Sequence, residues 1–145
     1  MSLFSLLSVS ASGMAAQRGR AELLVENIAN AETTRTPEGG PYRRRDAIFV
    51  SEEQTSPFSA VFQTALDSGP TGVRIAEVVE DLREPEKRYI PGHPDADADG
   101  YVLFPAMNPV EDMVDLMSAA RGYQANVAAM AAVKDMIQRS IDLLR

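Results

Sequence analysis

The residues best suited to chemistry lie together in one acidic turn, residues 95–100, which reads D-A-D-A-D-G. Carboxylates at the first, third and fifth positions, followed by a glycine, match the start of a calcium-binding loop. The match then fails, because the twelfth position is Ala106, where such a loop needs a bidentate glutamate, and the flanking residues favour strands over helices. We therefore interpret the turn as solvated and predict no metal site, with a calcium-binding module kept as an alternative.

Other groups that could carry out catalysis are few. His93 is the only histidine and the chain has no cysteine, so histidine-pair and thiolate metal sites are excluded. The acidic residues fall in polar stretches or on outer helix faces, and Glu111, Asp112 and Asp115 suit the positive end of a helix dipole. The glycine pair at 39–40 lacks the lysine and helix of a phosphate loop. We predict no catalytic residue, no cofactor, no small-molecule substrate and hence no enzyme.

Charge and hydropathy restrict the partners. The formal charge of -7 disfavours nucleic acid, which rewards clustered lysine and arginine. No run of about 18 apolar residues is present, so we expect nothing that spans a membrane. The N-terminus lacks a positively charged start, and Ser5, Ser8 and Ser10 interrupt its apolar tract. We therefore expect that it is not a cleavable signal peptide.

The longest predicted element is a C-terminal helix over residues 108–145. Asn108 suits the N-cap, Pro109 the first helical position, and Glu111 the third position of a capping box. At 1.5 Å per residue this helix would be roughly 50 Å long and needs a partner helix along its apolar face. One predicted packing row holds Leu116, Tyr123, Met130, Val133, Ile137 and Leu144. A second row beside it holds Met113, Met117, Ala120, Val127 and Ala131.

Residues 3–31 repeat this pattern and predict the partner helix. Its apolar positions recur at spacings of three and four, and the predicted packing residues are Leu7, Met14, Leu24 and Ile28. We expect the two terminal helices to pair as a coiled coil, although spacing alone leaves a compact helical bundle equally open. Polar residues on the apolar faces suit an interface that selects register; they are Ser10, Gln17, Gln124 and Asn126.

Two features of the C-terminal helix bear on packing. Gly122, beside Ala119 and Ala120, predicts a place where another helix backbone approaches closely. The methionines in or beside this helix fit either core filling or contact with several different partners, and the sequence does not separate the two. They are Met107, Met113, Met117, Met130 and Met136.

The middle of the chain, residues 33–107, predicts a small β-rich unit. Strands are expected at residues 46–50, 73–79, 87–90 and 101–104, where β-branched and aromatic residues gather. Residues 51–72 surround one apolar island at 58–66, which could be a short helix or unordered. The fold class is therefore mostly α with a small β-rich middle, divided into residues 1–32, 33–107 and 108–145.

Four segments together resemble the flagellar basal-body rod protein family and, within it, the proximal rod proteins. The segments are ENIANAE at 26–32, GGPYR at 39–43, YIPGHPDADADGYV at 89–102 and MVDLMSAARGYQAN at 113–126. Residues 62–66, FQTAL, are similar to the export-gate recognition element of related subunits. The residues that carry the family pattern are Asn27, Ile28, Ala29, Asn30, Gln124 and Asn126.

The resemblance implies a structural subunit of the proximal rod, which transmits torque through helices packed into a tube and so serves flagellum-dependent motility. It implies export into the periplasm by the flagellar type III apparatus without a cleavable signal peptide. Expected partners are the other proximal and distal rod proteins and the MS-ring and export-gate base. A self-associating helical adaptor outside the flagellum, like the calcium-binding module, remains an alternative from the residues alone.

Overall fold

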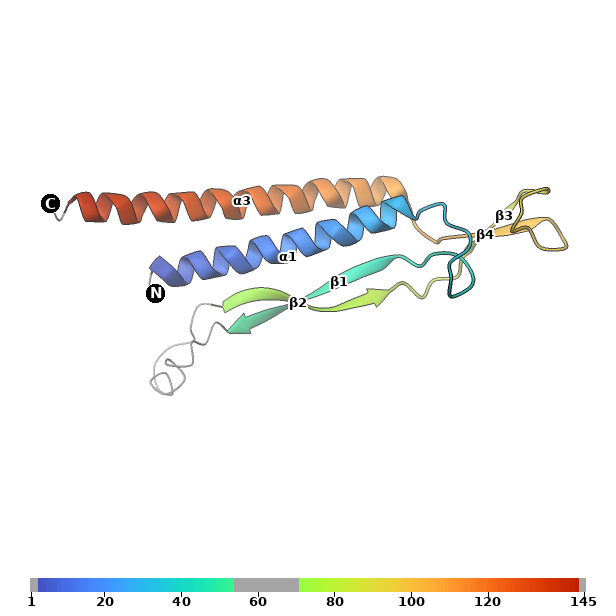
Figure 1. Ribbon diagram of the computed structural model, residues 1–145, viewed down its shortest axis with the longest axis horizontal. Coiled ribbons are helices and arrows are strands. Elements are labelled where there is room, and N and C mark those ends of the chain that lie inside the picture. The colour runs from blue at the N-terminus through green and yellow to red at the C-terminus, as the bar shows by residue number, and fades with distance from the viewer. Residues whose placement is uncertain (1–2, 54–70, 144–145) are drawn as a thin grey trace.

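The computed structural model describes residues 3–53 and 71–143. The element order is one long helix, four strands and a second long helix (Figure 1). The fold is therefore mostly helical with a β-containing middle, as the sequence predicts. The apolar island at 58–66, the motif at 62–66 and Leu144 lie outside the described residues.

Helix α3, Pro109–Asp142, begins where the sequence predicts. The Oδ1 atom of Asn108 accepts a hydrogen bond from the backbone N–H of Val110 at 3.1 Å, and Pro109 occupies the first turn. The expected capping box takes a different form. The Glu111 carboxylate accepts from the side-chain amide of Asn108 at 3.3 Å, because capping uses the oxygen of that amide and leaves its nitrogen available.

Helix α1, Leu3–Ala29, lies antiparallel beside α3 (Figure 1). A Cβ atom at Gly13 would lie 2.8 Å from Oδ1 of Asn126, and one at Gly122 would lie 3.1 Å from Cδ of Gln17. Both glycines therefore permit close approach, which confirms the prediction for Gly122. With Gly13 opposite Asn126, the start of α1 lies about level with Met136, so the last turns of α3 project beyond α1.

The hairpin of β1, Arg45–Glu53, and β2, Thr71–Glu80, packs on the other side of α1 (Figure 1). Its antiparallel register pairs Arg45 with Glu80 and Glu53 with Thr71, with one irregularity between Ile48 and Phe49. The Ser12 hydroxyl on α1 accepts a hydrogen bond from the backbone N–H of Val73 at 3.1 Å. Helix α1 is thus the middle layer between α3 and the hairpin.

A second hairpin, β3 (Glu86–Tyr89) with β4 (Tyr101–Phe104), lies near the end of the molecule where α1 ends and α3 begins (Figure 1). It pairs Tyr89 with Tyr101, whose rings stack edge to face at 5.4 Å. All four predicted strands are confirmed, and the first two are longer than predicted. They form two separate two-stranded sheets.

The buried apolar core is small for a chain of this length. Within the described residues it consists of Ala16, Leu24, Tyr42, Val102, Ala119 and Val133. Many large apolar side chains are exposed instead, and those on α3 include Val110, Met113, Val114, Met117, Val127 and Met136. Neither described helix has the length and apolarity required to cross a bilayer.

Candidate functional site

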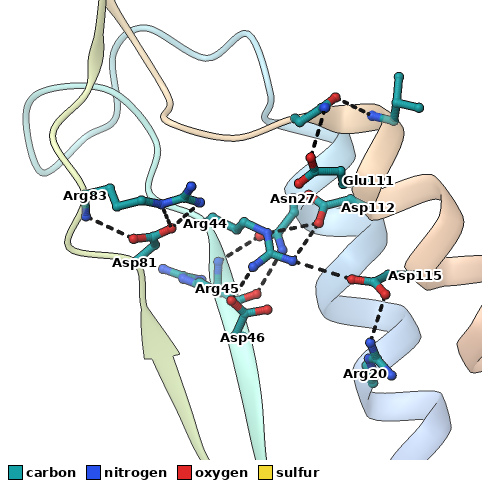
Figure 2. Close-up of polar contacts among 12 residues, drawn as sticks. Arg20, Asn27, Arg44, Arg45, Asp46, Asp81, Arg83, Glu111, Asp112 and Asp115 are labelled. Carbon is teal, nitrogen blue, oxygen red and sulfur yellow. Dashed lines mark hydrogen bonds and ion pairs between the residues drawn. The ribbon is translucent and has the colours of Figure 1, made fainter.

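The most densely bonded part of the molecule is a cluster of polar side chains where α1 ends and α3 begins, which we call the polar junction (Figure 2). It joins three parts of the fold: the second half of α1, the residues that lead into β1, and the first turns of α3. Its members are Arg20, Asn27, Tyr42, Arg44, Arg45, Asp46, Asp112 and Asp115.

Asn27 fixes the start of β1 to α1. Its side chain is 0% exposed, and its Nδ2 donates to the backbone carbonyl of Arg45 at 2.8 Å. Its Oδ1 accepts from the backbone N–H of Arg45 and from the hydroxyl of Tyr42, each at 2.9 Å. Burial, together with the charge of Glu26, raises the pKa of the Tyr42 phenol, against a lowering by Arg45. The phenol therefore stays a neutral donor to Asn27.

Arg44 connects the same segment to α3. Its Nε and Nη2 atoms donate to Oδ1 of Asp112 at 2.9 and 2.8 Å, and it also pairs with Asp46 (Figure 2). Partial burial would lower the pKa of the Arg44 guanidinium, but the hydrogen bond and charge of Asp112, with Asp46 and Asp115, outweigh burial and raise that pKa. The pair is therefore ionised at all ordinary pH values.

Asp115 connects α3 to α1. Its Oδ1 lies 3.2 Å from Nη2 of Arg20, and its Oδ2 lies 3.8 Å from Nη2 of Arg44. Asp112 itself is 1% exposed, and its Oδ2 accepts no hydrogen bond from the described residues. The prediction that the acidic residues lie on outer helix faces is thus wrong for Asp112, because its partner Arg44 draws it into the interior.

A second ion pair lies beside the junction in the segment after β2. The Asp81 carboxylate accepts from the backbone N–H of Arg83 at 2.9 Å and from its Nε at 2.6 Å. These hydrogen bonds, the one from the side chain first, hold the pKa of Asp81 below its ordinary 3.8. Asp81 also donates its backbone N–H to the carbonyl of Arg44 at 2.8 Å, so this turn is tied to the junction.

The predicted packing residues divide into two groups. Leu24 and Val133 are buried, at 3% and 6% exposed, and the half-buried members of this group are Leu7, Met14, Ile28, Leu116, Met130 and Ile137. Together with Asp112, Ala119, Tyr123 and Asn126, the α3 members follow a spacing of three and four along the face turned toward α1. We call this face the inner row: Asp112, Leu116, Ala119, Tyr123, Asn126, Met130, Val133 and Ile137.

The other group lies on an exposed face of α3. Met113, Met117 and Val127 are 49%, 55% and 45% exposed, and Tyr123, at 41%, lies at the margin of the inner row. With the exposed residues between them they form what we call the outer row: Met113, Met117, Ala120, Gln124, Val127 and Ala131. No residue of the outer row carries a charge.

The family-pattern residues have distinct structural roles. Asn30 ends α1, donating from Nδ2 to the carbonyl of Glu26 at 2.9 Å and accepting from the Thr33 hydroxyl at 3.1 Å. Asn126 donates to the carbonyl of Gly122 at 2.9 Å beside Gly13. Ala29 and Gln124 are exposed.

The carboxylates of the acidic turn serve the turn itself. Asp97 Oδ1 accepts from the backbone N–H groups of Asp99 and Tyr101 at 3.0 and 2.8 Å, and His93 Nδ1 accepts from Asp95 at 3.1 Å. The Asp95 carboxylate accepts from the Thr34 hydroxyl at 2.8 Å. In residues 3–53 and 71–143, no group of three or more histidine, aspartate or glutamate side chains is arranged to hold a metal ion.

Two unequal helices, a polar junction that joins them and an uncharged exposed row are features of a subunit built for helix-packed assembly. Residues 98–143 match the family described as flagellar basal body rod FlgEFG protein C-terminal. The chain is 40% identical to the flagellar basal-body rod protein FlgC of Borreliella burgdorferi, over 100% of this chain and 99% of the relative. It is 37% identical to the FlgC proteins of Bacillus subtilis and Salmonella typhimurium, over 99% of this chain and 99% and 98% of those relatives.

The chain therefore belongs to the FlgC family of flagellar basal-body rod proteins. It is a structural subunit of the flagellar basal body. The relatives are rod proteins rather than enzymes, and they support neither the calcium-binding module nor the free-standing adaptor.

Proposed function

We propose that this rod subunit transmits torque by packing α1 and α3 against the helices of neighbouring subunits in a tube. Within the subunit the two helices pair as a coiled coil, and the outer row of α3 provides the contact with neighbours. The observation that carries the proposal is the outer row, an uncharged face with heptad spacing that nothing in the described chain covers. Torque transmission needs such contacts, because only packed helices resist twisting together.

The middle of α3 supports a neighbour on more than one side. From Gly122 to Val133 no residue is charged, and Val127 and the alanines around it are exposed on several faces. A helix that is apolar all round is ordinarily buried on all sides. The alanines would allow neighbouring helices to approach closely, and the flexible methionines would adapt to neighbours of different sequence.

Assembly would also stabilise the subunit. Full burial of a methionine side chain contributes about 1.5 to 3 kcal/mol, so covering the exposed half of Met113 and Met117 adds roughly 1 kcal/mol each. The ends of α1 and α3 remote from the polar junction have little cover within the chain. We expect these ends to gain helical order on assembly, while the polar junction is already formed in the isolated subunit.

The position in the flagellum and the partners follow from the family. We place the subunit in the proximal, periplasmic part of the rod, between the MS-ring and export-gate base and the distal rod proteins. It would arrive through the type III export apparatus without a cleavable signal peptide. Residues 1–32 and 108–145 would form the rod wall and residues 33–107 the unit outside it, with no role for nucleic acid, a cofactor or a small-molecule substrate.

The experiment is a pair of substitutions at Met117, tested for motility in cells whose only copy of this subunit is the variant. Met117→Asp places a charge on the outer row and should abolish swimming and the recovery of the subunit in basal bodies. Met117→Leu keeps an apolar side chain of similar volume and should leave both unchanged. The side chain is half-exposed, so both isolated variants should retain the circular dichroism spectrum of the unmodified chain. Normal swimming with Met117→Asp would refute the proposal.

A further inference from the structure

Helix α3 buries a carboxylate and exposes the methionine next to it. Asp112 is 1% exposed, whereas Met113 and Met117 are 49% and 55% exposed. Hydrophobic burial alone would favour the reverse, because removing an ionised carboxylate from water costs several kcal/mol and burying a methionine is favourable. The orientation of α3 on α1 therefore needs another cause.

Two faces of α3 have the spacing needed to pack on α1. The inner row and the outer row, as defined above, share the same alternation of three and four residues and are offset by one position. A rotation of α3 by about 100° about its axis would exchange them. Apart from Asp112, neither row carries a charge, so the apolar pattern leaves the choice of row open.

The rotation would break the contacts that involve the charged residues. Asp112 would leave Arg44, which now donates to it at 2.9 and 2.8 Å, and Asp115 would leave Arg20, now at 3.2 Å. Met113 would take the place of Asp112 beside the Arg44 guanidinium. The two close approaches, Gly13 with Asn126 and Gly122 with Gln17, would also be lost.

We infer that Asp112, through Arg44, determines which row of α3 packs on α1. The pair contributes specificity more than stability, as a single buried polar contact can do in a helix pair. Arg44 suits this role because it is held in place: it also pairs with Asp46 on β1, next to Arg45, whose backbone is bonded to Asn27. The consequence is that the outer row stays exposed. This inference concerns the subunit alone and holds whether or not the outer row contacts rod neighbours.

Disulfide cross-linking in the purified full-length chain tests the inference, since the chain has no cysteine of its own. One reporter carries Gly13→Cys with Asn126→Cys and detects the inner row against α1. The other carries Gly13→Cys with Val127→Cys and detects the outer row in that place. With Asp112 present, the first reporter should cross-link about tenfold more than the second. With Asp112→Leu, the two cross-linked fractions should come within about threefold of each other.

Asp135→Leu is the matched control, because it removes the same charge from an exposed position on the same helix. It should leave the preference for the first reporter unchanged. Asp112→Leu leaves Arg44 paired with Asp46, so the chain should still fold. An unchanged preference in Asp112→Leu would show that the apolar rows alone choose the face and would overturn the inference. Loss of both cross-links would overturn it too, since Asp112 would then be required for folding rather than for the choice of row.

Discussion

Replacement of Asn27 by alanine should destabilise the chain more than any other single loss of a polar side chain in α1. The substitution removes three hydrogen bonds, two with the backbone of Arg45 and one with the Tyr42 hydroxyl, from a side chain that is 0% exposed. At about 1 kcal/mol net for each bond, the loss is about 3 kcal/mol, and unsatisfied groups left buried would raise it further. Tyr42→Phe removes one of the three bonds and should cost about 1 kcal/mol.

The assay is urea unfolding of the full-length chain followed by circular dichroism, with the midpoint and slope compared between variants. Asn30→Ala is the matched control. Asn30 bonds only to Glu26 and Thr33, on neighbouring turns, and is partly exposed, so its loss should cost less than about 1 kcal/mol. If Asn27→Ala and Asn30→Ala lower the free energy of unfolding equally, the polar junction does not hold β1 on α1 as described.

Three further predictions concern close packing and titration. Gly13→Ala should destabilise the helix pair despite the better helix propensity of alanine, because its Cβ would lie 2.8 Å from Asn126 Oδ1, and adding Asn126→Ala should restore thermal stability. Arg83 holds the pKa of Asp81 below 3.8, so this pair stabilises the fold at higher pH and loses its effect as pH falls through the lowered pKa; a carboxyl NMR titration of Arg83→Gln should show that pKa rise. The pKa of Tyr42 lies above 10.0, mainly through burial, so its stabilising effect is complete below that pH and is lost as pH rises through the raised pKa; absorbance titration should show one late phenol that disappears in Tyr42→Phe.

The helices and strands could be predicted because their signals are local. The cap at Asn108, the proline after it and the alternation of three and four in both helices lie within single segments, and the structure follows them. The four strands likewise follow runs of β-branched and aromatic residues. The close approach at Gly122 was also predictable, because a glycine among alanines has no other evident use in a helix.

The polar junction could not be predicted, because its partners are distant in the sequence. Arg44 and Asp112 are 68 positions apart, and a short basic run beside an acidic helix start has an adequate local explanation in solvation and the helix dipole. The sequence also offers two rows on α3 without indicating which is covered, since that choice depends on Arg44. Among the family-pattern residues, the buried role of Asn27 depends on Tyr42 and Arg45, whose positions are fixed only by the turn that follows α1.

The most direct test of the assembly account is the reactivity of a single cysteine placed on the outer row. Met117→Cys introduces the only thiol in the chain, at a position that is 55% exposed in the isolated subunit. A maleimide should label it rapidly in the purified chain and at least about tenfold more slowly in intact basal bodies, because neighbouring helices cover it there. Equal labelling rates in the two states would contradict the claim that the outer row is the surface on which the rod assembles.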